Sequence, residues 1–401
     1  MHSSNLQSPM PSLCIVCTSA NTVPIFEMPA VPVNTIRLWS SRAAACSAAR
    51  ARIELTCCKN CGHLFNRCYD DDLVDYEADY DSSQMCSTRF RRYAEELADR
   101  LITTHNLYQK DIVEIGGGRG EFLRIICNRG DNRGVSFDRS FHPDPSDDVP
   151  ANLRFVRDYY NAKYASESAD LIVCRHVLEH IWEPRSLVGT VRQAIGDRKD
   201  VVVYFEVPNG EFILREQVFW EIIYQHPSYF TKGSLARLFT MCGFQIRDIE
   251  ESFGGQFLAI EASAPAENAV PDRNSVSRNT STTEELGRAL DAMFSARMAN
   301  WEARLGQLQE KRKRVVAWGA GAKATTYLNI IDPAGSVISH VIDINPRKTG
   351  RFIPGSGQEI VAPNTLKELR PEVIILMNEI YRDEIAADTA AFGLNPTFLV
   401  P

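Results

Sequence analysis

The sequence predicts an α/β protein with two Rossmann-like parallel sheets and a small cysteine-rich module in front of them. From residue 111 onward, short β-branched runs alternate with helical stretches, a pattern that indicates a parallel sheet covered by helices. A second pattern of the same kind begins at residue 315. Residues 12–70 hold seven of the eleven cysteines and are expected to be loop-rich, with little core of their own.

Length and charge narrow the possible classes of protein. A chain of 401 residues exceeds what one hydrophobic core usually fills, so two or three domains are expected. The net charge of -7 and the pI near 5.7 give no electrostatic reason to bind nucleic acid, and the basic run at 311–314 is expected to be a solvated helix end. No apolar run has the roughly 18 residues of a membrane span, and residues 1–12 lack the regions of a secretory signal. We therefore expect a cytoplasmic protein without a membrane partner.

Two CxxC pairs in the front region predict a structural zinc site. Cys14 and Cys17 form the first pair, and Cys58 and Cys61 form the second. Each pair places two thiolates on one side of a tetrahedral ion, and four sulfur ligands with no open position favour Zn²⁺. The gap between the pairs is longer than in compact zinc ribbons, so unligated cysteines are the alternative. The remaining cysteines of this region are expected to be ordinary small apolar residues: Cys46, Cys57 and Cys68.

The central region is predicted to form a parallel sheet that ends in a hairpin. Its apolar runs are, in order, DIVEIGG, RGVSFD, LRFVRD, ADLIVCRH and VVVYFEVPN. The helix-like stretch TKGSLARLFTMCGF follows, and then FQIRDIEES and QFLAIEAS flank the glycines of FGGQ. Two sequential strands around such a turn predict an antiparallel hairpin at one end of the sheet.

The turn VEIGGGRGEF, residues 113–122, predicts a cofactor site. Gly116, Gly118 and Gly120 follow an apolar strand and precede a helical stretch, where glycine lets the backbone approach a ligand closely. Glu114 lies inside the strand, where its carboxylate would meet the amino-acid end of a cofactor such as S-adenosylmethionine. Dinucleotide dehydrogenases use a similar turn, so the glycines alone do not decide between the two cofactors.

Two aspartates after the next strands are candidates for the other parts of the cofactor. Asp138 ends the second run about 20 residues beyond Gly118, where an acidic side chain can accept both ribose hydroxyls. Asp158 follows the third run and is a weaker candidate for the adenine amino group. The alternative is that these acids, with Glu114, are strand-end surface residues. The joint placement of Glu114 and Asp138 around one turn favours the cofactor.

Beyond residue 263 the sequence predicts a linker, a long helix and a second α/β region. The helix is expected to start at a capping box of Thr282 with Glu285. GAGAK at 319–323 lies between an apolar run and a helix, so its backbone could cradle a phosphate or only pack the turn. Asp343 ends the following strand much as Asp138 does, which makes a nicotinamide site the rival interpretation.

These motifs together resemble the sugar C-methyltransferases, which act on nucleotide-linked deoxyketosugars. The resemblance runs from about Cys14 to Pro401 through CIVC with CKNC, YEADYDSS, VEIGGGRGEF, CRHVLEHI, YQHPSYFTKGSLARLF and VVAWGAGAKATTYLN. It implies a zinc-binding module at 12–75, a class I S-adenosylmethionine-dependent core at 76–263, a linker at 264–283 and a Rossmann-like C-methyltransferase domain at 284–401. The hairpin at the sheet edge is also typical of class I methyltransferases.

The resemblance also implies which residues act on the substrate. His226 matches the family's proposed general base, His180 an active-site histidine, and Tyr80 a tyrosine that reaches the sugar from the front region. The triplet before the helix-like stretch TKGSLARLFTMCGF reads Tyr-Gln-His at 224–226, where the family has His-Glu-His. Ile223 replaces a tyrosine of the family. A histidine of near-neutral pKa suits the removal of a proton beside a carbonyl, which makes the neighbouring carbon nucleophilic.

We therefore expect methyl transfer from S-adenosylmethionine to carbon of a carbonyl-bearing small molecule, possibly nucleotide-linked. Three alternatives stay open on the sequence. An O- or N-methyltransferase would share every cofactor residue, a nicotinamide oxidoreductase would use GAGAK and Asp343, and a zinc scaffold would bind neither cofactor.

Overall fold

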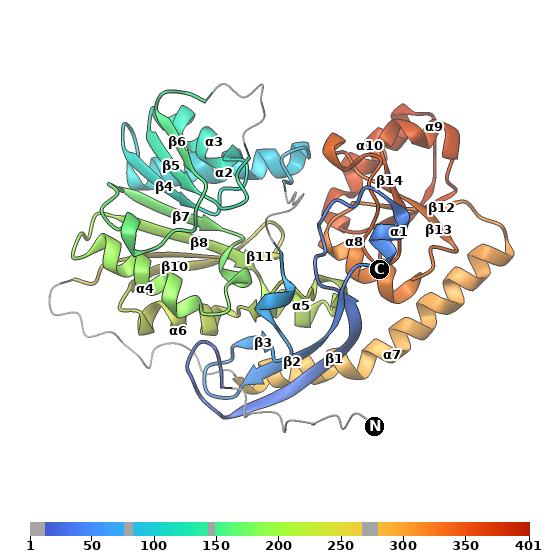
Figure 1. The fold of residues 1–401 in the computed structure, drawn as a ribbon, viewed down its shortest axis with the longest axis horizontal. Helices are drawn as coiled ribbons and strands as arrows, with labels where there is room; N and C mark the ends of the chain where they lie inside the picture. Colours follow the sequence, from blue (N-terminus) through green and yellow to red (C-terminus); the bar gives the residue numbers. More distant parts are fainter. Residues whose placement is uncertain (1–12, 76–82, 143–148, 267–279) are drawn as a thin grey trace.

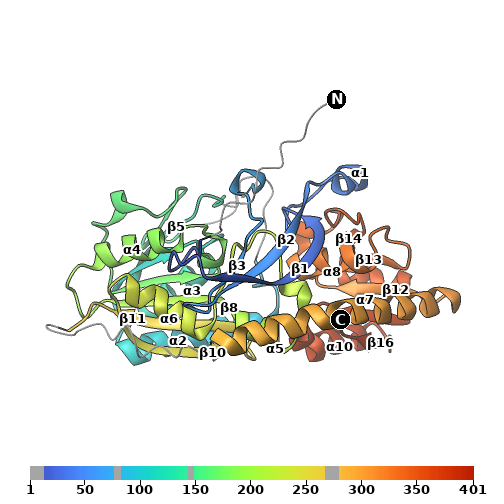
Figure 2. The same cartoon turned by 90° about the horizontal axis from the view of Figure 1, so that it is seen from below.

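A computed structural model of the chain describes residues 13–75, 83–142, 149–266 and 280–401. It confirms the predicted α/β class, with two helix-covered sheets at the two ends of the molecule (Figure 1). A smaller antiparallel sheet and a long helix lie between and beneath them, as the turned view in Figure 2 also shows.

The larger α/β part contains a seven-stranded sheet in the order β10-β11-β8-β7-β4-β5-β6. Five strands are parallel: β4 (Asp111–Ile115), β5 (Arg133–Phe137), β6 (Leu153–Val156), β7 (Leu171–Arg175) and β8 (Val202–Pro208). The predicted hairpin is β10 (Gln245–Ser252) with β11 (Phe257–Ser263), antiparallel at the sheet edge. These strands confirm the class I methyltransferase topology that the sequence predicts.

Helices cover both faces of this sheet because its strands are apolar on both sides. The covering helices are α2 (Thr88–His105), α3 (Glu121–Gly130), α4 (Pro184–Ile195) and α6 (Lys232–Met241). Ile112 on β4 packs in the core that holds α2 and α3, and its neighbour Val113 packs in the core that holds α4 and α6. Successive strand residues point to opposite faces, so an unbroken apolar run is what a doubly covered strand requires.

The C-terminal α/β part contains a five-stranded parallel sheet in the order β14-β13-β12-β15-β16. Its strands are β12 (Val315–Trp318), β13 (Ile338–Ile342), β14 (Glu359–Val361), β15 (Val373–Leu376) and β16 (Thr397–Leu399), and its helices are α8 (Ala322–Ile331), α9 (Leu366–Leu369) and α10 (Arg382–Ala391). The sequence predicts β12, β13 and β15. The two edge strands have only three residues each, too few to show a hydrophobic pattern.

The front region differs from the loop-rich module that its composition predicts. It contains β1 (Thr22–Pro32), α1 (Arg42–Cys46), β2 (Arg50–Cys58) and β3 (Leu64–Asn66), and the sheet is completed by β9 (Ser228–Tyr229) from the larger α/β part. Met28 and Ile53 are fully buried in a core shared with Trp301 and Tyr327 of the C-terminal region. The expectation of little core was wrong because other parts of the chain provide the apolar surface against which these strands pack.

Helix α7 (Thr280–Glu310) links the two α/β parts and packs along β1. The structure describes it from Thr280 onward, so Thr282, which was expected to cap the helix, lies inside it. Along this helix Leu290, Trp301 and Leu305 are buried, while Met293 is exposed. None of the helices that the structure describes has the length and apolar content needed to cross a bilayer.

Candidate active site

A cavity of about 1600 Å³ lies between the two α/β parts. It is lined by residues at the carboxyl ends of β4, β5, β7 and β8 and of β12 and β13 of the second sheet. Ligands of open α/β sheets bind at this end of the strands. Since pockets for one small ligand usually hold about 300–1,000 Å³, this cavity has room for a cofactor and a second molecule.

The glycine turn after β4 forms one wall of the cavity. Gly116 and Gly118 have φ angles of +73° and +56°, which L side chains rarely adopt. A Cβ atom at Gly117 would lie 2.0 Å from Glu114 Oε2, whereas one at Gly118 would meet nothing within 4 Å. Backbone at Gly118 therefore faces open space, as a ligand-binding turn requires. Gly120 is different: its φ is +72°, it faces the ring of Phe155, and it does not line the cavity.

Glu114 lies at the base of this wall with a buried carboxyl group. Its side chain lines the cavity, the residue is 5% exposed, and Oε2 has no hydrogen-bond partner among the described residues. Burial raises the pKa of Glu114 to about 7, although the Ser136 hydroxyl and the Arg175 charge act in the opposite direction. A buried acceptor without a partner fits the ammonium group of an amino-acid moiety.

Asp138 and Asp158 have different surroundings. Asp138 lines the cavity, and its carboxylate accepts hydrogen bonds from Gly118 N at 2.7 Å and from Ser140 N at 2.7 Å. Asp158 does not line the cavity; it pairs with Lys163 and accepts a hydrogen bond from Tyr164 Oη at 2.7 Å. These two contacts lower the pKa of Asp158 to about 2. Asp158 thus lies outside the cavity, where it does not reach the place expected for the adenine.

Aromatic residues take the place expected for Asp158. Tyr159, Tyr160 and Asn161 follow β6 and line the cavity. Sequence reasoning selected the acid of RDYYN and missed the aromatic pair, which offers apolar surface for a flat base. The two adjacent tyrosines were the available signal.

His180 and His226 face each other on the opposite wall. His180 ends the 3₁₀ turn Leu178–His180 after β7, and His226 precedes β9. The ring centroids are 4.6 Å apart at an angle of 79°. Burial lowers the pKa of His180 to about 4 and that of His226 well below its usual value, so both rings are neutral at pH 7. The structure therefore brings together the two histidines that the resemblance selects.

The loop that carries His226 is held by the front region. Gln225 Oε1 accepts hydrogen bonds from Thr35 N at 2.9 Å and Thr35 Oγ1 at 2.6 Å. Tyr224 Oη donates to Cys68 O at 3.1 Å and accepts from the backbone N–H of Asp70 at 2.9 Å. The Tyr-Gln pair before His226 therefore anchors the loop. Tyr80, the third expected substrate residue, lies outside the described residues.

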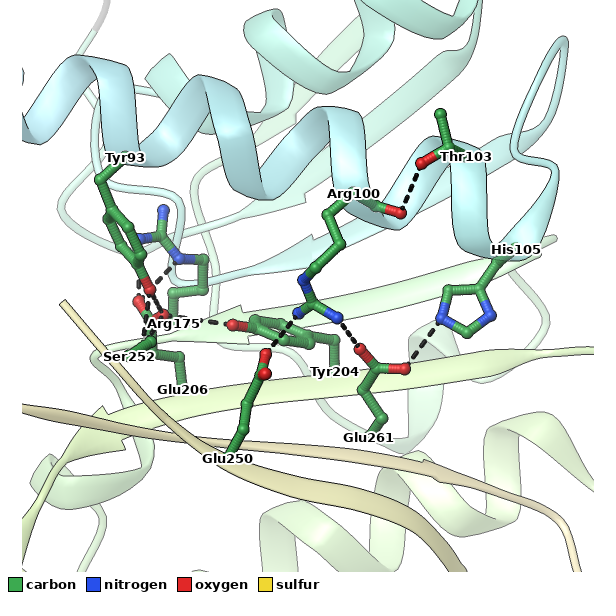
Figure 3. A network of polar contacts seen from close by, with 10 residues as sticks. All are labelled: Tyr93, Arg100, Thr103, His105, Arg175, Tyr204, Glu206, Glu250, Ser252 and Glu261. Atoms are coloured by element: carbon green, nitrogen blue, oxygen red, sulfur yellow. Dashed lines mark hydrogen bonds and ion pairs between the residues drawn. The ribbon is translucent and has the colours of Figure 1, made fainter. Parts of the chain in front are cut away.

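A buried charge network links strands β7 and β8 to helix α2 (Figure 3). Arg175 at the end of β7 donates from Nε at 3.0 Å and Nη2 at 2.8 Å to Glu206 Oε1, and Tyr93 and Tyr204 donate to Glu206 Oε2. Burial raises the pKa of Glu206, but the charge of Arg175 and the adjacent His176 outweigh burial and hold it well below its usual range. Arg175 also lines the cavity. The sequence did not reveal this pair, because 31 residues separate its members.

The four predicted zinc ligands form one cluster at the tip of the front sheet. Sγ of Cys14 lies 3.6 Å from Sγ of Cys61, and Sγ of Cys17 lies 3.5 Å from Sγ of Cys58. A tetrahedral ion with Zn–S bonds of about 2.3 Å separates its sulfurs by about 3.8 Å. The cluster uses Cys58, and the adjacent Cys57 packs in the core of the front sheet.

The second glycine turn, GAGAK, lines the same cavity from the C-terminal side. Asp343 after β13 accepts hydrogen bonds from Ala320 N at 2.8 Å and from Lys348 Nζ at 3.2 Å. Lys323 pairs with Glu221 and donates to Gln256 Oε1 at 3.1 Å. Lys323 of this turn and Lys348 after β13 are thus each paired with a carboxylate of the protein itself.

Comparison with known proteins finds two regions of the chain that match known families. Residues 85–249 match the family described as "Methyltransferase domain", and residues 281–401 match the family described as "C-methyltransferase C-terminal domain". The chain is 25% identical over 333 residues to the C-methyltransferase NovU of Streptomyces niveus, a match that covers 77% of this chain and 76% of that protein.

Among solved structures, two matched methyltransferases each cover less than half of the chain. The 1,6-didemethyltoxoflavin-N1-methyltransferase of Burkholderia thailandensis is 16% identical with a TM-score of 0.34, over 45% of this chain and 82% of that one. The magnesium protoporphyrin IX methyltransferase of Synechocystis is 13% identical with a TM-score of 0.33, over 44% of this chain and 84% of that one.

The fold, the glycine turn and the two family matches define a class. The chain is an S-adenosylmethionine-dependent methyltransferase. Its residues 281–401 match the C-methyltransferase C-terminal domain, and the C-methyltransferase NovU is one of its relatives.

Proposed function

We propose that this enzyme methylates a carbon atom beside a carbonyl group in a small molecule that resembles a nucleotide-linked sugar. The observation that carries the proposal is the single cavity, which has the glycine turn after β4 on one wall and the His180–His226 pair on another. A methyl donor and an acceptor with an acidic C–H bond can meet in such a cavity. We also propose that the chain is divided into the four regions expected from the sequence, 12–75, 76–263, 264–283 and 284–401; helix α7 starts within the third of them.

Residues of the first turn fit the cofactor, which supplies an electrophilic methyl group when bound. Gly118 leaves open space in front of its backbone, and the buried Glu114 Oε2 has no partner among the described residues. We propose that Glu114 holds the ammonium group, that Gly116 and Gly118 pass close to the cofactor, and that Asp138 accepts the ribose hydroxyls in place of the Gly118 N–H. Gly120 and Asp158 do not line the cavity: Gly120 contacts Phe155, and Asp158 accepts a hydrogen bond from Tyr164, whose ring packs against the cavity-lining Phe137.

The acceptor side is assigned to residues on the opposite wall and to the C-terminal part. We propose that His226 removes the proton, that His180 orients it, and that Tyr80 reaches the substrate from the front region. Neutral imidazoles at both positions have lone pairs available to accept a proton. Arg347 and Arg351 line the C-terminal side of the cavity, where cationic side chains suit phosphate groups.

The proposed function is tested by product analysis. Protein incubated with methyl-labelled S-adenosylmethionine and a panel of nucleotide-linked ketosugars should yield one labelled product. NMR of this product should show the labelled methyl group bonded to a carbon atom. A label on oxygen or nitrogen would replace C-methylation with the O- or N-methyltransferase alternative. Binding of NADH without binding of S-adenosylmethionine, measured by isothermal titration, would overturn the proposal.

His226→Ala should separate catalysis from cofactor binding. We expect turnover to fall by about 10² to 10⁴, the usual contribution of a general base, while the affinity for S-adenosylhomocysteine stays within about twofold. The matched control is His340→Ala on β13, a histidine that does not line the cavity. Full turnover in His226→Ala would make this histidine a structural residue.

We also propose that the four-cysteine cluster binds one structural Zn²⁺. The sulfur separations of 3.5 and 3.6 Å fit tetrahedral coordination, and these free cysteines are expected in a reducing compartment such as the cytoplasm. Metal analysis of purified protein should find one zinc per chain, and Cys58→Ser with Cys61→Ser should lose it, whereas Cys46→Ser at an exposed site should not.

Loss of this zinc should also reach the catalytic wall. Strand β3 follows the second cysteine pair and pairs with β9, two residues after His226. Hydrogen exchange of residues 223–230 should therefore speed up in the zinc-free variant. Unchanged exchange there together with retained metal would contradict the assignment.

A further inference from the structure

A carboxyl group lies beside the two histidines, and among the described residues no arginine or lysine forms an ion pair with it. Glu179 precedes His180 in the 3₁₀ turn after β7, and the residue is 2% exposed. One oxygen of Glu179 and one nitrogen each of His180 and His226 lie within 4.8 Å of one another. Glu179 lines the cavity, and its Oε2 atom is buried with no hydrogen-bond partner among the described residues.

The side chains of the two neighbouring strands do not supply a positive charge to Glu179. Glu206 on β8 is negative and paired with Arg175, and Tyr229 on β9 is neutral because burial raises its pKa. Helix α4 contributes apolar side chains, such as Val188 and Val191, to the core that also contains Leu178, the residue before Glu179.

Three histidines lie near Glu179. His176 Nδ1 lies 3.8 Å from Glu179 Oε1, beyond hydrogen-bond distance, and the other nitrogen of that ring lies 3.1 Å from Glu206 Oε1. Burial lowers the pKa of both His180 and His226. Burial also raises the pKa of Glu179 to about 8, so the carboxyl group is mainly protonated at pH 7.

We propose that Glu179 is a catalytic acid whose carboxyl group donates a hydrogen bond to the carbonyl oxygen of the methyl acceptor. This inference rests on the proposed function, since it needs an acceptor with a carbonyl group. A neutral carboxylic acid in an apolar site can stabilise the negative charge that develops on such an oxygen. Three features suit Glu179 to this role: its place on the cavity wall, its unpartnered oxygen and its distance from His226.

The step balances with groups that the chain itself provides. His226 takes the proton of the C–H bond beside the carbonyl, and the electron pair of that bond moves toward the carbonyl oxygen. The O–H of Glu179 stabilises this oxygen without leaving the carboxyl group. The electron pair then returns to form the new bond from carbon to the methyl group, which bound S-adenosylmethionine would supply while leaving as a neutral thioether, and His226 releases its proton to water.

Two substitutions distinguish a neutral donor from a charged carboxylate. The amide of Glu179→Gln still donates a hydrogen bond, so this variant should keep turnover with a nucleotide-linked ketosugar within about tenfold of wild type. Glu179→Ala has no donor and should lose about 10²- to 10³-fold, as expected for removing one oxyanion-hole group. Glu216→Gln, at an exposed position that does not line the cavity, is the matched control and should not change turnover.

A spectroscopic measurement tests the protonation state without turnover. Infrared spectra of the complex with S-adenosylhomocysteine should show a protonated carboxyl band that is absent in Glu179→Gln and that disappears in wild type as the pH rises through about 8. The same rise in pH should lower turnover of wild type but not of Glu179→Gln.

Three outcomes would overturn the inference. They are equal losses in the Gln and Ala variants, an ionised Glu179 at pH 7, and a second metal ion per chain that depends on Glu179, His180 and His226. Failure of wild type to methylate any carbonyl compound would instead remove the proposed function, even where the infrared band shows a protonated Glu179.

Discussion

The two glycine turns that line the cavity begin with the same kind of backbone hydrogen bond. Gly116 N donates to Phe137 O at 2.8 Å after β4, and Gly319 N donates to Ile342 O at 2.7 Å after β12. The aspartate after the next strand then accepts from the turn in both cases, through Oδ2 of Asp138 at 2.7 Å and of Asp343 at 2.8 Å.

The side chains around the two turns differ in charge. Glu114 lies two residues before the first glycine of its turn, where the second turn has Ala317. At the second turn Lys348, which is 7% exposed, donates to Asp343 Oδ2 at 3.2 Å and to Ala320 O at 3.1 Å. The ammonium group of Lys348 therefore occupies Asp343, the carboxylate that the ribose of a second cofactor would have to contact. Shared hydrogen bonds of the turn therefore do not suffice for cofactor binding. The charges around each turn decide which of the two can bind a cofactor.

The largest effect should come from removing the second aspartate. Asp343→Ala leaves Lys348 buried without its carboxylate, and breaking a buried ion pair in this way costs about 3–5 kcal/mol of unfolding free energy. The equivalent change at the first turn, Asp138→Ala, should instead weaken binding of S-adenosylmethionine by about 1–3 kcal/mol through the lost ribose contacts. Urea unfolding and isothermal titration of both variants measure the two effects.

The double variant Asp343→Ala with Lys348→Met is the control for this comparison. It removes the unpaired charge and should recover most of the lost stability. If Asp343→Ala weakens cofactor binding more than Asp138→Ala does, the assignment of the two turns is reversed.

A smaller effect is expected from adding one methyl group to each turn. The Cβ atom of Gly117→Ala would lie 2.0 Å from Glu114 Oε2, so the carboxyl group has to move, and we expect affinity for S-adenosylhomocysteine to fall by about 10- to 100-fold. Gly321→Ala meets nothing within 4 Å and has a φ of -105°, so it should leave affinity and melting temperature unchanged. Equal affinities of the two variants would show that Glu114 does not contact the cofactor.

The sequence predicts the strands of both parallel sheets where hydrophobic runs are long enough to be seen. The strands from β4 to β8 and the two strands of the hairpin are four or more residues long, and they lie where the pattern predicts them. Strands β9, β14 and β16 have two or three residues each and depend on partners far away in sequence. The front sheet was underestimated because its core partners, α7 and α8, follow it by more than 200 residues.

The site is predictable in part for a similar reason. Glu114, Asp138 and the four cysteines are fixed by local spacing, and the structure places each of them beside the groups that the spacing predicts. Burial and pairing are not local properties. The protonated state expected of Glu179 depends on what surrounds it in space, and Asp158 is turned away by Lys163, which the strand pattern does not reveal.

The smallest effect we predict is a dependence of cofactor affinity on pH that belongs to the first turn alone. Burial holds the pKa of Glu114 at about 7 in the folded protein, against 4.5 for an unperturbed glutamate. The folded state therefore binds this proton more tightly than the unfolded state, and the ligand-free protein should lose stability as the pH rises from about 4.5 to 7. Binding has the opposite sign, because only the ionised carboxylate pairs with the ammonium group of S-adenosylmethionine.

Affinity for S-adenosylmethionine should accordingly rise about tenfold between pH 6 and pH 8, since each pH unit below the pKa of Glu114 removes about nine-tenths of the ionised form. Near pH 7, binding should release a fraction of a proton, which titrations in buffers of different ionisation enthalpy detect. Glu114→Gln should bind more weakly and without this release. The same variant also corrects for titration of the ligand's own amino group. A release that persists in Glu114→Gln would assign the proton to another group, and the charge difference between the two turns would then not explain which of them binds the cofactor.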